Sequence, residues 1–467
     1  MFQAIDPASG SPAHTTPEMT ADQVEAALAR AQAAFGTWRL TPLAERARLL
    51  EAIAEQFDAH RERLARLATT EMGKTLKSAR AEVEKCAGGL RYYAQHGPDM
   101  LREIEVPTAS GATVRQHWLP IGPVLAVMPW NFPYWQVIRF LAPAIMAGNV
   151  GLLKHASLTQ GCASAIEEMV VAGGAPAGLF QNLAIRAGAV GGLIADPRIA
   201  AVTLTGSEEA GAKVAAQAGA ALKKVVLELG GSDPFIVMPS ADLDKAVQTA
   251  VAARLQNAGQ SCICAKRMIV HADIYDAFAE RFTAAMVSAK VGDPTDESVD
   301  LGPLSSIEQR DTVLAQLARF QAAGAKLAGG AALAGKGAFM QPGVLTHVPP
   351  EDPIAQEELF GPVAMLFRVA DIDQAIALAN DVPFGLGSSV WTTDPGEQDR
   401  FVRDLEAGMT AINQMLASTP EAAFGGVKRS GHGRELGPWG MHEFMNLKTV
   451  IAAETPAPAP TPQVQGE

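Results

Sequence analysis

The chain has 467 residues, of which 48% are hydrophobic and 19% are charged, so it is long enough to form two or three globular domains. Its formal net charge of -12 at pH 7 argues against a nucleic acid or an anionic membrane as partner, because both bind to basic surfaces. The 4 cysteines are too few for a disulfide framework, and no Cys/His cluster has the spacing of a zinc site, so we expect no metal.

The ends and the apolar stretches of the chain bear on its location in the cell. Residues 1–6 contain no basic region followed by an apolar one, so no signal peptide is expected. The longest apolar stretch, residues 140–153, is too short to span a membrane and is interrupted by Pro143 and Asn149. These features predict a cytoplasmic protein. The Pro-rich residues 455–467 cannot bury apolar surface, which predicts a disordered tail.

From residue 120 onward, apolar stretches typical of buried strands alternate with helical patterns. In the first half of this region we expect strands at residues 124–128, 150–154 and 200–204, with helices from about Leu158 and from Gly206. In the second half we expect strands at residues 235–238 and 267–270, with a helix at residues 243–255 between them. Such alternation predicts parallel sheets covered by helices, the doubly wound α/β class that is suited to a dinucleotide.

The turn at residues 206–211 is a candidate phosphate-binding element. No Gly-x-Gly-x-x-Gly sequence follows any of the expected strands. In its place Gly206 and Ser207 open a helix directly after a strand, and the free backbone N–H groups of such a turn can face a pyrophosphate. An ordinary helix start has the same sequence, so the residues alone leave both interpretations open.

Cys262 is the candidate nucleophile of the chain. It follows Gly259, Gln260 and Ser261 on a turn-prone segment, and loops on a rigid scaffold commonly carry reactive groups. A free cysteine is also often a small buried hydrophobic residue. This segment alone does not decide between the two.

Three further motifs favour a catalytic Cys262. They are Pro129-Trp130-Asn131-Phe132-Pro133, Glu228-Leu229-Gly230-Gly231 and Glu357-Glu358-Leu359-Phe360-Gly361-Pro362. In this order, the motifs make the chain resemble the NAD(P)-dependent aldehyde dehydrogenase superfamily up to about Val450. Within the superfamily, Leu153-Lys154-His155-Ala156 and residues 424–431 resemble the bacterial succinate-semialdehyde dehydrogenases.

The resemblance implies a fold of three parts. Residues 1–102 and 120–229 would form a doubly wound, parallel-sheet cofactor domain, and residues 230–430 a second α/β domain for catalysis. Residues 103–119 and 444–452 would form a small β arm that pairs with a neighbouring subunit in a homodimer or homotetramer. From the residues alone, these last two segments are equally consistent with a surface hairpin.

The resemblance also assigns the reaction to three residues. Oxidation of an aldehyde requires a carbon that can expel hydride, and addition of the Cys262 thiolate gives a thiohemiacetal that does so. The side-chain amide of Asn131 and the backbone N–H of Cys262 would stabilise the oxyanion. Glu228 would then activate the water that hydrolyses the thioester, and its apolar neighbours are expected to raise its pKa.

NADP or NAD is the implied cofactor, and Ser157 favours acceptance of NADP. Many NAD-preferring members have Glu at this position, where its charge would repel a 2′-phosphate. Lys154 would bind the adenosine ribose, and Glu358 the nicotinamide ribose. The remaining expected cofactor contacts are Trp130, Gly206, Ser207, Leu229 and Phe360.

A short aldehyde with a carboxylate at its far end is the expected substrate, and succinic semialdehyde fits best. Arg139 lies eight residues after Asn131, so on a helix both side chains share a face. A guanidinium pairs bidentately with a carboxylate. Gln256 stands where some relatives have a second arginine, and Ser418 or Thr419 would add a neutral hydrogen bond.

Several alternatives stay open. The same machinery would serve another semialdehyde or an uncharged aldehyde. A cofactor-free cysteine hydrolase would use Cys262 and Glu228, but it has no use for Lys154 or Glu358. A binding or structural protein on an inactivated scaffold would not need an intact set of catalytic residues. Cys264 is either a redox partner that caps Cys262 as a disulfide or an inert buried cysteine.

Overall fold

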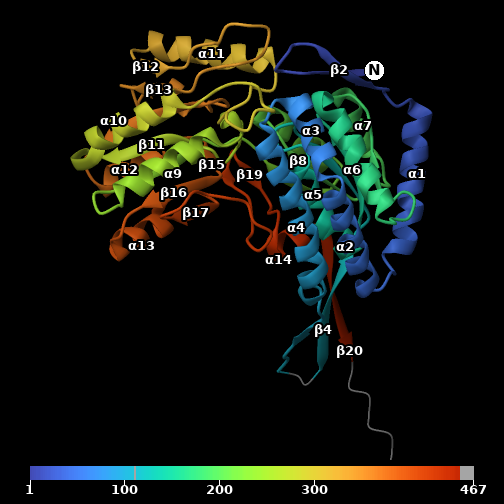
Figure 1. The fold of residues 1–467 in the computed structure, drawn as a ribbon. Helices are drawn as coiled ribbons and strands as arrows, with labels where there is room; N and C mark the ends of the chain where they lie inside the picture. The colour runs from blue at the N-terminus through green and yellow to red at the C-terminus, as the bar shows by residue number, and fades with distance from the viewer. Residues whose placement is uncertain (110–111, 453–467) are drawn as a thin grey trace, which may run out of the picture.

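The computed structural model describes residues 1–109 and 112–452 and builds them around two large sheets and a projecting smaller one (Figure 1). The first large sheet has 6 strands in the order β19-β9-β8-β5-β6-β7. They are β5 (Pro123–Met128), β6 (Val150–His155), β7 (Phe180–Asn182), β8 (Ala201–Thr205), β9 (Lys224–Glu228) and β19 (Gly431–His432). Neighbours are parallel except for β19, which pairs antiparallel with β9.

Helices pack against this sheet and share one apolar core with it (Figure 1). They are α1 (Ala21–Trp38), α2 (Leu43–Ala59), α3 (Arg61–Met72), α4 (Leu76–Met100), α5 (Trp135–Ala147), α6 (Gln160–Ala172), α7 (Val190–Ala195) and α8 (Glu208–Ala220). Every residue of β6 is buried, as expected of a parallel strand covered on both faces. Gly148 ends α5 at φ 97°, a left-handed cap that glycine adopts without strain.

The second large sheet has 7 strands in the order β12-β13-β14-β11-β10-β16-β17. They are β10 (Asp233–Val237), β11 (Ala265–His271), β12 (Lys326–Gly329), β13 (Gly343–Thr346), β14 (Val363–Val369), β16 (Gly387–Trp391) and β17 (Met409–Ile412). Its helices are α9 (Leu243–Leu255), α10 (Ala272–Ser288), α11 (Ile307–Ala322), α12 (Ile372–Asn380) and α13 (Pro395–Asp404). Successive residues of β10 enter two different apolar clusters, since strand side chains alternate between the faces of a sheet.

A three-stranded antiparallel sheet projects away from both large sheets (Figure 1). It consists of β3 (Ile104–Val106), β4 (Thr113–Pro120) and β20 (Met445–Ala452). The smaller elements are β1 (Phe2–Ile5), β2 (Pro12–Thr16), β15 (Phe384–Gly385), β18 (Val427–Lys428), α14 (Gly437–His442) and the 3-10 turns η1 (Ser157–Thr159), η2 (Ala187–Ala189), η3 (Gln256–Gly259) and η4 (Pro353–Gln356). No helix within residues 1–109 and 112–452 is long and apolar enough to cross a membrane.

The α/β fold expected from the sequence is confirmed, with parallel strands and helices in the expected order. The helix expected from Gly206 begins two residues later because Ser207 is its N-cap. The sequence did not predict that β19 would complete the first sheet, since Gly431 and His432 form a strand too short to have a pattern. The predicted tail, residues 455–467, lies outside the described residues.

Candidate active site

The loop that carries Cys262 has a strained backbone. Asn257 (φ 53°) and Ala258 (φ 55°) both lie in the left-handed region, which non-glycine residues seldom adopt. Gly259 follows at φ 74°, and a Cβ there would collide with the carbonyl oxygen of Gly361. Strain of this kind persists only where surrounding contacts hold it, and it is typical of functional loops.

Arg254 on α9 supplies contacts that fix this loop. Its buried guanidinium donates to the carbonyl oxygens of Val363 at 2.6 Å and Leu359 at 2.8 Å. It also donates to the carbonyl oxygen of Gly259 at 3.4 Å, so one side chain ties the nucleophile loop to the residues around Glu358. The sequence analysis missed Arg254, because an arginine on an amphipathic helix is usually a solvated surface residue.

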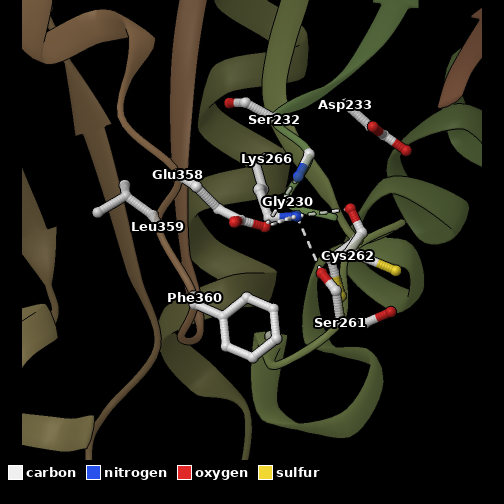
Figure 2. A network of polar contacts seen from close by, with 12 residues as sticks. Gly230, Ser232, Asp233, Ser261, Cys262, Lys266, Glu358, Leu359 and Phe360 are labelled. Atoms are coloured by element: carbon white, nitrogen blue, oxygen red, sulfur yellow. Dashed lines mark hydrogen bonds and ion pairs between the residues drawn. The ribbon is translucent and has the colours of Figure 1, made fainter. Parts of the chain in front are cut away.

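Cys262 is half-buried and lines both a large and a small pocket. Burial raises the pKa of its thiol to about 12, and the positive charges of Arg139 and Lys266 oppose this rise. The ammonium of Lys266 donates to the carbonyl oxygens of Cys262 at 2.8 Å and Ser261 at 2.9 Å (Figure 2). At neutral pH the resting side chain is therefore a thiol, which would have to lose its proton in order to attack a substrate.

Two donors suited to an oxyanion adjoin Cys262. Asn131 is 4% exposed, lines the large pocket with Cys262, and donates from Nδ2 to the carbonyl oxygen of Gln260 at 3.0 Å. An amide nitrogen has two hydrogens, so the second one stays available to a ligand. Within the described part of the chain, the backbone N–H of Cys262 has no acceptor. Asn257 donates to the carbonyl oxygen of Asn131 at 2.8 Å and thereby joins the two segments.

Glu228 ends β9 and is only 1% exposed. Neither carboxylate oxygen has a hydrogen-bond partner among the described residues, and burial together with nearby Glu435 raises its pKa well above the usual value. The side chain lines neither pocket, and a Cβ added to Gly425 would come within 2.7 Å of its Oε1. In this conformation the Glu228 carboxyl lies outside both pockets, so the side chain must turn in order to act at Cys262.

The large pocket has a volume of about 300 Å³ and lies at the carboxyl ends of β5, β8 and β9, where open α/β sheets bind their ligands. The expected cofactor residues that line it are Trp130, Gly206, Ser207, Leu229, Glu358 and Phe360. The rings of Trp130 and Phe360 meet edge to face, with their centroids 5.8 Å apart. The sequence analysis did not single out Gln309, Thr312 and Gln316 of α11, which also line the pocket.

Glu358 is held at the wall of the large pocket from two sides (Figure 2). Its Oε1 lies 3.0 Å from Nζ of Lys266 and accepts from the backbone N–H of Gly231 at 3.2 Å. A Cβ at Gly230 would lie 2.6 Å from Oε2 of Glu358, so only glycine lets the carboxylate approach the backbone this closely. The carboxylate is therefore oriented before any ligand binds.

Lys154 and Ser157 lie at the carboxyl end of β6 and do not line the large pocket. Lys154 is paired in register with Val127 of β5, which places it on the sheet edge next to the Trp130 segment. It is 9% exposed, burial lowers its pKa, and no described residue forms a hydrogen bond or ion pair with its ammonium. Ser157 is exposed in η1. A nearly buried ammonium without a partner fits the hydroxyls or phosphate of a dinucleotide.

The small pocket, about 40 Å³ in volume, reaches Cys262 and is lined by Arg139. We expected the guanidinium of Arg139 to be free for a substrate carboxylate. Instead it forms a buried ion pair with Glu435 and donates from Nη2 to Oγ1 of Thr205 at 3.1 Å. Two of its three nitrogens are therefore engaged, a pairing that the sequence could not reveal because Glu435 lies far along the chain.

The structure places some of the remaining predicted site residues at the small pocket and others away from it. Ser418 is buried and lines the small pocket, whereas Thr419 is exposed and does not line it. Gln256 lines the pocket as well. Cys264 is buried, its thiol donates to the carbonyl oxygen of Gln256 at 3.4 Å, and burial raises its pKa. Lys85 of α4, which the sequence analysis overlooked, also lines the small pocket.

A cysteine between a dinucleotide-binding edge and a pocket with basic residues is the site of a nicotinamide-dependent enzyme that acts through a thiol. Residues 1–450 match the aldehyde dehydrogenase family, and the chain belongs to this family. It is 52% identical over 452 residues to succinate-semialdehyde dehydrogenase 1, NADP(+) type, of Mycobacterium tuberculosis, covering 96% of this chain and 99% of that protein.

Solved structures agree with this membership. Succinic semialdehyde dehydrogenase from Streptococcus pyogenes, in complex with NADP+ as the cofactor, is 38% identical and superposes with a TM-score of 0.95 over 97% of this chain and 100% of that one. Succinate-semialdehyde dehydrogenase from Burkholderia pseudomallei is 37% identical, with a TM-score of 0.94 over 97% of this chain and 94% of that one.

Proposed function

We propose that this enzyme oxidises succinic semialdehyde to succinate and uses NADP, or less effectively NAD, as the oxidant. The observation that carries the proposal is that Cys262 opens to both pockets at once. The large pocket suits a dinucleotide at the end of a parallel sheet. The small pocket is basic and narrow, which suits a short aldehyde with a carboxylate. The names of the related proteins support the same substrate and cofactor.

The residues of the chain divide the reaction into two halves. The Cys262 sulfur adds to the aldehyde carbon, and the free Asn131 amide hydrogen and the Cys262 N–H hold the oxyanion. A nicotinamide held in the large pocket would supply the oxidising chemistry by taking up hydride. Glu228 turns toward the resulting thioester, takes a proton from water, and releases the acid. No residue that the structure describes forms a hydrogen bond with its buried carboxyl, which supports such a movement.

The cofactor assignment rests on the fit of the sheet edge. Lys154 offers an ammonium that has no partner among the described residues near exposed Ser157, and no carboxylate at position 157 opposes a 2′-phosphate. Glu358, oriented by Lys266, would accept hydrogen bonds from the nicotinamide ribose. Gly206 and Ser207 would face the pyrophosphate.

Two further assignments belong to the same proposal. We propose a cytoplasmic homo-oligomer in which the sheet of β3, β4 and β20 pairs with a neighbouring subunit. Exposed apolar residues along β20, among them Ile451 at 72% exposure, support this assignment.

We also propose that Cys264 forms a disulfide with Cys262 under oxidation. Inactivation by peroxide that dithiothreitol reverses, and that is irreversible in Cys264→Ala, would support the disulfide; equal behaviour of both proteins would refute it.

The test of the proposed function is the appearance of reduced nicotinamide absorbance after the protein is mixed with NADP or NAD and a panel of aldehydes. We expect the highest kcat/KM for succinic semialdehyde, followed by glutarate semialdehyde and then butanal. Equal values for succinic semialdehyde and butanal would overturn the substrate. Ester hydrolysis without any oxidation of aldehydes would favour the hydrolase alternative.

A further inference from the structure

The small pocket has room for little more than the tail of a short substrate. A cavity needs about 10–15 Å³ to hold one water-sized group, so about 40 Å³ accommodates roughly three such groups. Succinic semialdehyde has two methylenes and one carboxylate beyond its aldehyde carbon. If the aldehyde lies at Cys262 and its tail enters this pocket, residues of the pocket receive the carboxylate.

The carboxylates around the small pocket already have basic or N–H partners within the protein. Glu435 is paired with Arg139. Glu82 of α4 is paired with Lys74 and accepts from the backbone N–H groups of Tyr134 at 2.8 Å and Trp135 at 2.9 Å. A substrate carboxylate would therefore enter a pocket where Arg139 is already neutralised, and it needs a further cation.

Lys85 is that cation. In the part of the chain that the structure describes, its ammonium forms no ion pair, and its one hydrogen bond is to Oγ of Ser418 at 2.9 Å. The ammonium also lies 4.4 Å from the ring centroid of Trp135, a position that favours its charged form. An ammonium has three hydrogens, so Lys85 retains donors for a ligand.

Ser418 is arranged to donate to the same ligand. Its Oγ accepts from Nζ of Lys85 at 2.9 Å and from Nε1 of Trp135 at 2.8 Å. Neither of these groups can accept a hydrogen bond, so both lone pairs of the hydroxyl are used. The hydroxyl hydrogen of Ser418 must then point to a third group, and no described residue provides an acceptor for it.

Building on the proposed function, we propose that Lys85 is the substrate-specificity residue of this enzyme: its ammonium and the Ser418 hydroxyl together bind the far carboxylate of the aldehyde. Arg139 lines the same pocket, and the one guanidinium nitrogen that is not engaged by Glu435 or Thr205 also contacts the carboxylate. The arrangement explains why Gln256 can replace a second arginine, because the missing charge is supplied from α4.

The experiment compares kcat/KM for succinic semialdehyde and butanal, two aldehydes with the same number of carbons, in four proteins. The parent enzyme should prefer succinic semialdehyde. In Lys85→Met the ratio of the two kcat/KM values should fall about ten-fold or more, through KM for succinic semialdehyde, because a charge-assisted bond is lost. Lys85→Arg should restore most of the ratio. Lys77→Met, which removes an exposed lysine from the same helix, should leave the ratio unchanged.

The outcomes separate this inference from the proposed function. No preference for succinic semialdehyde in the parent would overturn the proposed substrate. A clear preference in the parent that persists in Lys85→Met would overturn the role of Lys85 alone. If Lys85→Met does not fold, Lys85→Gln gives the same test, since it keeps a donor for Ser418 and removes the charge. Butanoate inhibition of butanal oxidation that is equally strong in the parent and in Lys85→Gln would also refute the assignment.

Discussion

The ammonium of Lys266 lies 3.0 Å from Oε1 of Glu358 and 2.8 Å from the carbonyl oxygen of Cys262. A single fully buried cation thus joins the loop of Cys262 to the wall of the large pocket. Because Lys266 also opposes the rise in the pKa of Cys262, it influences both the position and the acidity of the thiol. Binding of the cofactor and reactivity of the cysteine are therefore connected through one side chain.

Replacement of Lys266 tests this connection. We expect Lys266→Met to raise KM for NADP about ten-fold, since Glu358 loses a charge-assisted contact of roughly 1.5 kcal/mol. The rate of thiol alkylation at neutral pH should also fall, because the thiol pKa rises. Initial rates at varied NADP and iodoacetamide labelling measure the two effects. Lys326→Met, an exposed lysine of the same sheet, is the control, and a normal KM for NADP in Lys266→Met would contradict the prediction.

Replacement of Cys262 and replacement of Glu228 are predicted to block different steps of the reaction. Cys262→Ala should show no reduced cofactor at all, because no thiohemiacetal forms. Glu228→Gln should release one equivalent of reduced cofactor per site in a burst and then turn over about 100-fold or more slowly, because a neutral amide cannot take a proton from water. Stopped-flow absorbance distinguishes the two. Parallel loss of burst and steady state in Glu228→Gln would remove Glu228 from deacylation.

Position 157 is predicted to set the choice of cofactor. Ser157→Glu should lower the ratio of kcat/KM for NADP to that for NAD by about ten-fold or more, because one negative charge then faces the 2′-phosphate in a partly screened site. Ser157→Gln has the same size without the charge and should change the ratio far less. Equal ratios in Ser157→Glu and the parent would show that the adenosine ribose lies elsewhere.

The pH dependence of KM is predicted from Lys85. Burial lowers its pKa to about 8, with Arg139 and Lys74 acting in the same direction and Cys86 and Glu82 opposing them. Above this pH the free enzyme loses the ammonium, so KM for succinic semialdehyde should rise with pH, approaching about ten-fold per pH unit. KM for butanal should not follow this curve. Profiles for both aldehydes across the alkaline range check the prediction, and coincident profiles would contradict it.

Site residues that belong to short sequence motifs could be predicted from the sequence. Cys262, Glu228 and Glu358 each stand in a short motif with turn-forming glycines, so residue type and order were informative. Lys85 and Lys266 could not be found in this way. Lys85 stands among other charged residues on an amphipathic helix, and Lys266 stands in a strand. Only tertiary contacts show that half-buried Lys85 and buried Lys266 both lie at the site.

The same limit applied to Arg139. The helical spacing assumed between Asn131 and Arg139 was wrong, because α5 begins at Trp135, after Asn131. Arg139 nevertheless lines the small pocket with Cys262, and its partner Glu435 is brought to it by the fold. The orientation of the Glu228 side chain could not be predicted from the sequence either. A raised pKa follows from apolar neighbours, whereas the direction in which the side chain points depends on the packing of Gly425 and Glu435 around it.

The pairing of β19 with β9 has a consequence for how the enzyme is made. Gly431 lies opposite Glu228, and the carbonyl oxygen of Ser430 accepts from the backbone N–H of Leu229 at 2.9 Å. A nascent chain must therefore emerge from the ribosome almost to its end before β9, which carries Glu228, gains its second neighbour. Until then that strand is an open edge that other chains can join. Chains that end before Gly431 are therefore expected to expose this edge and to associate more readily than the full chain.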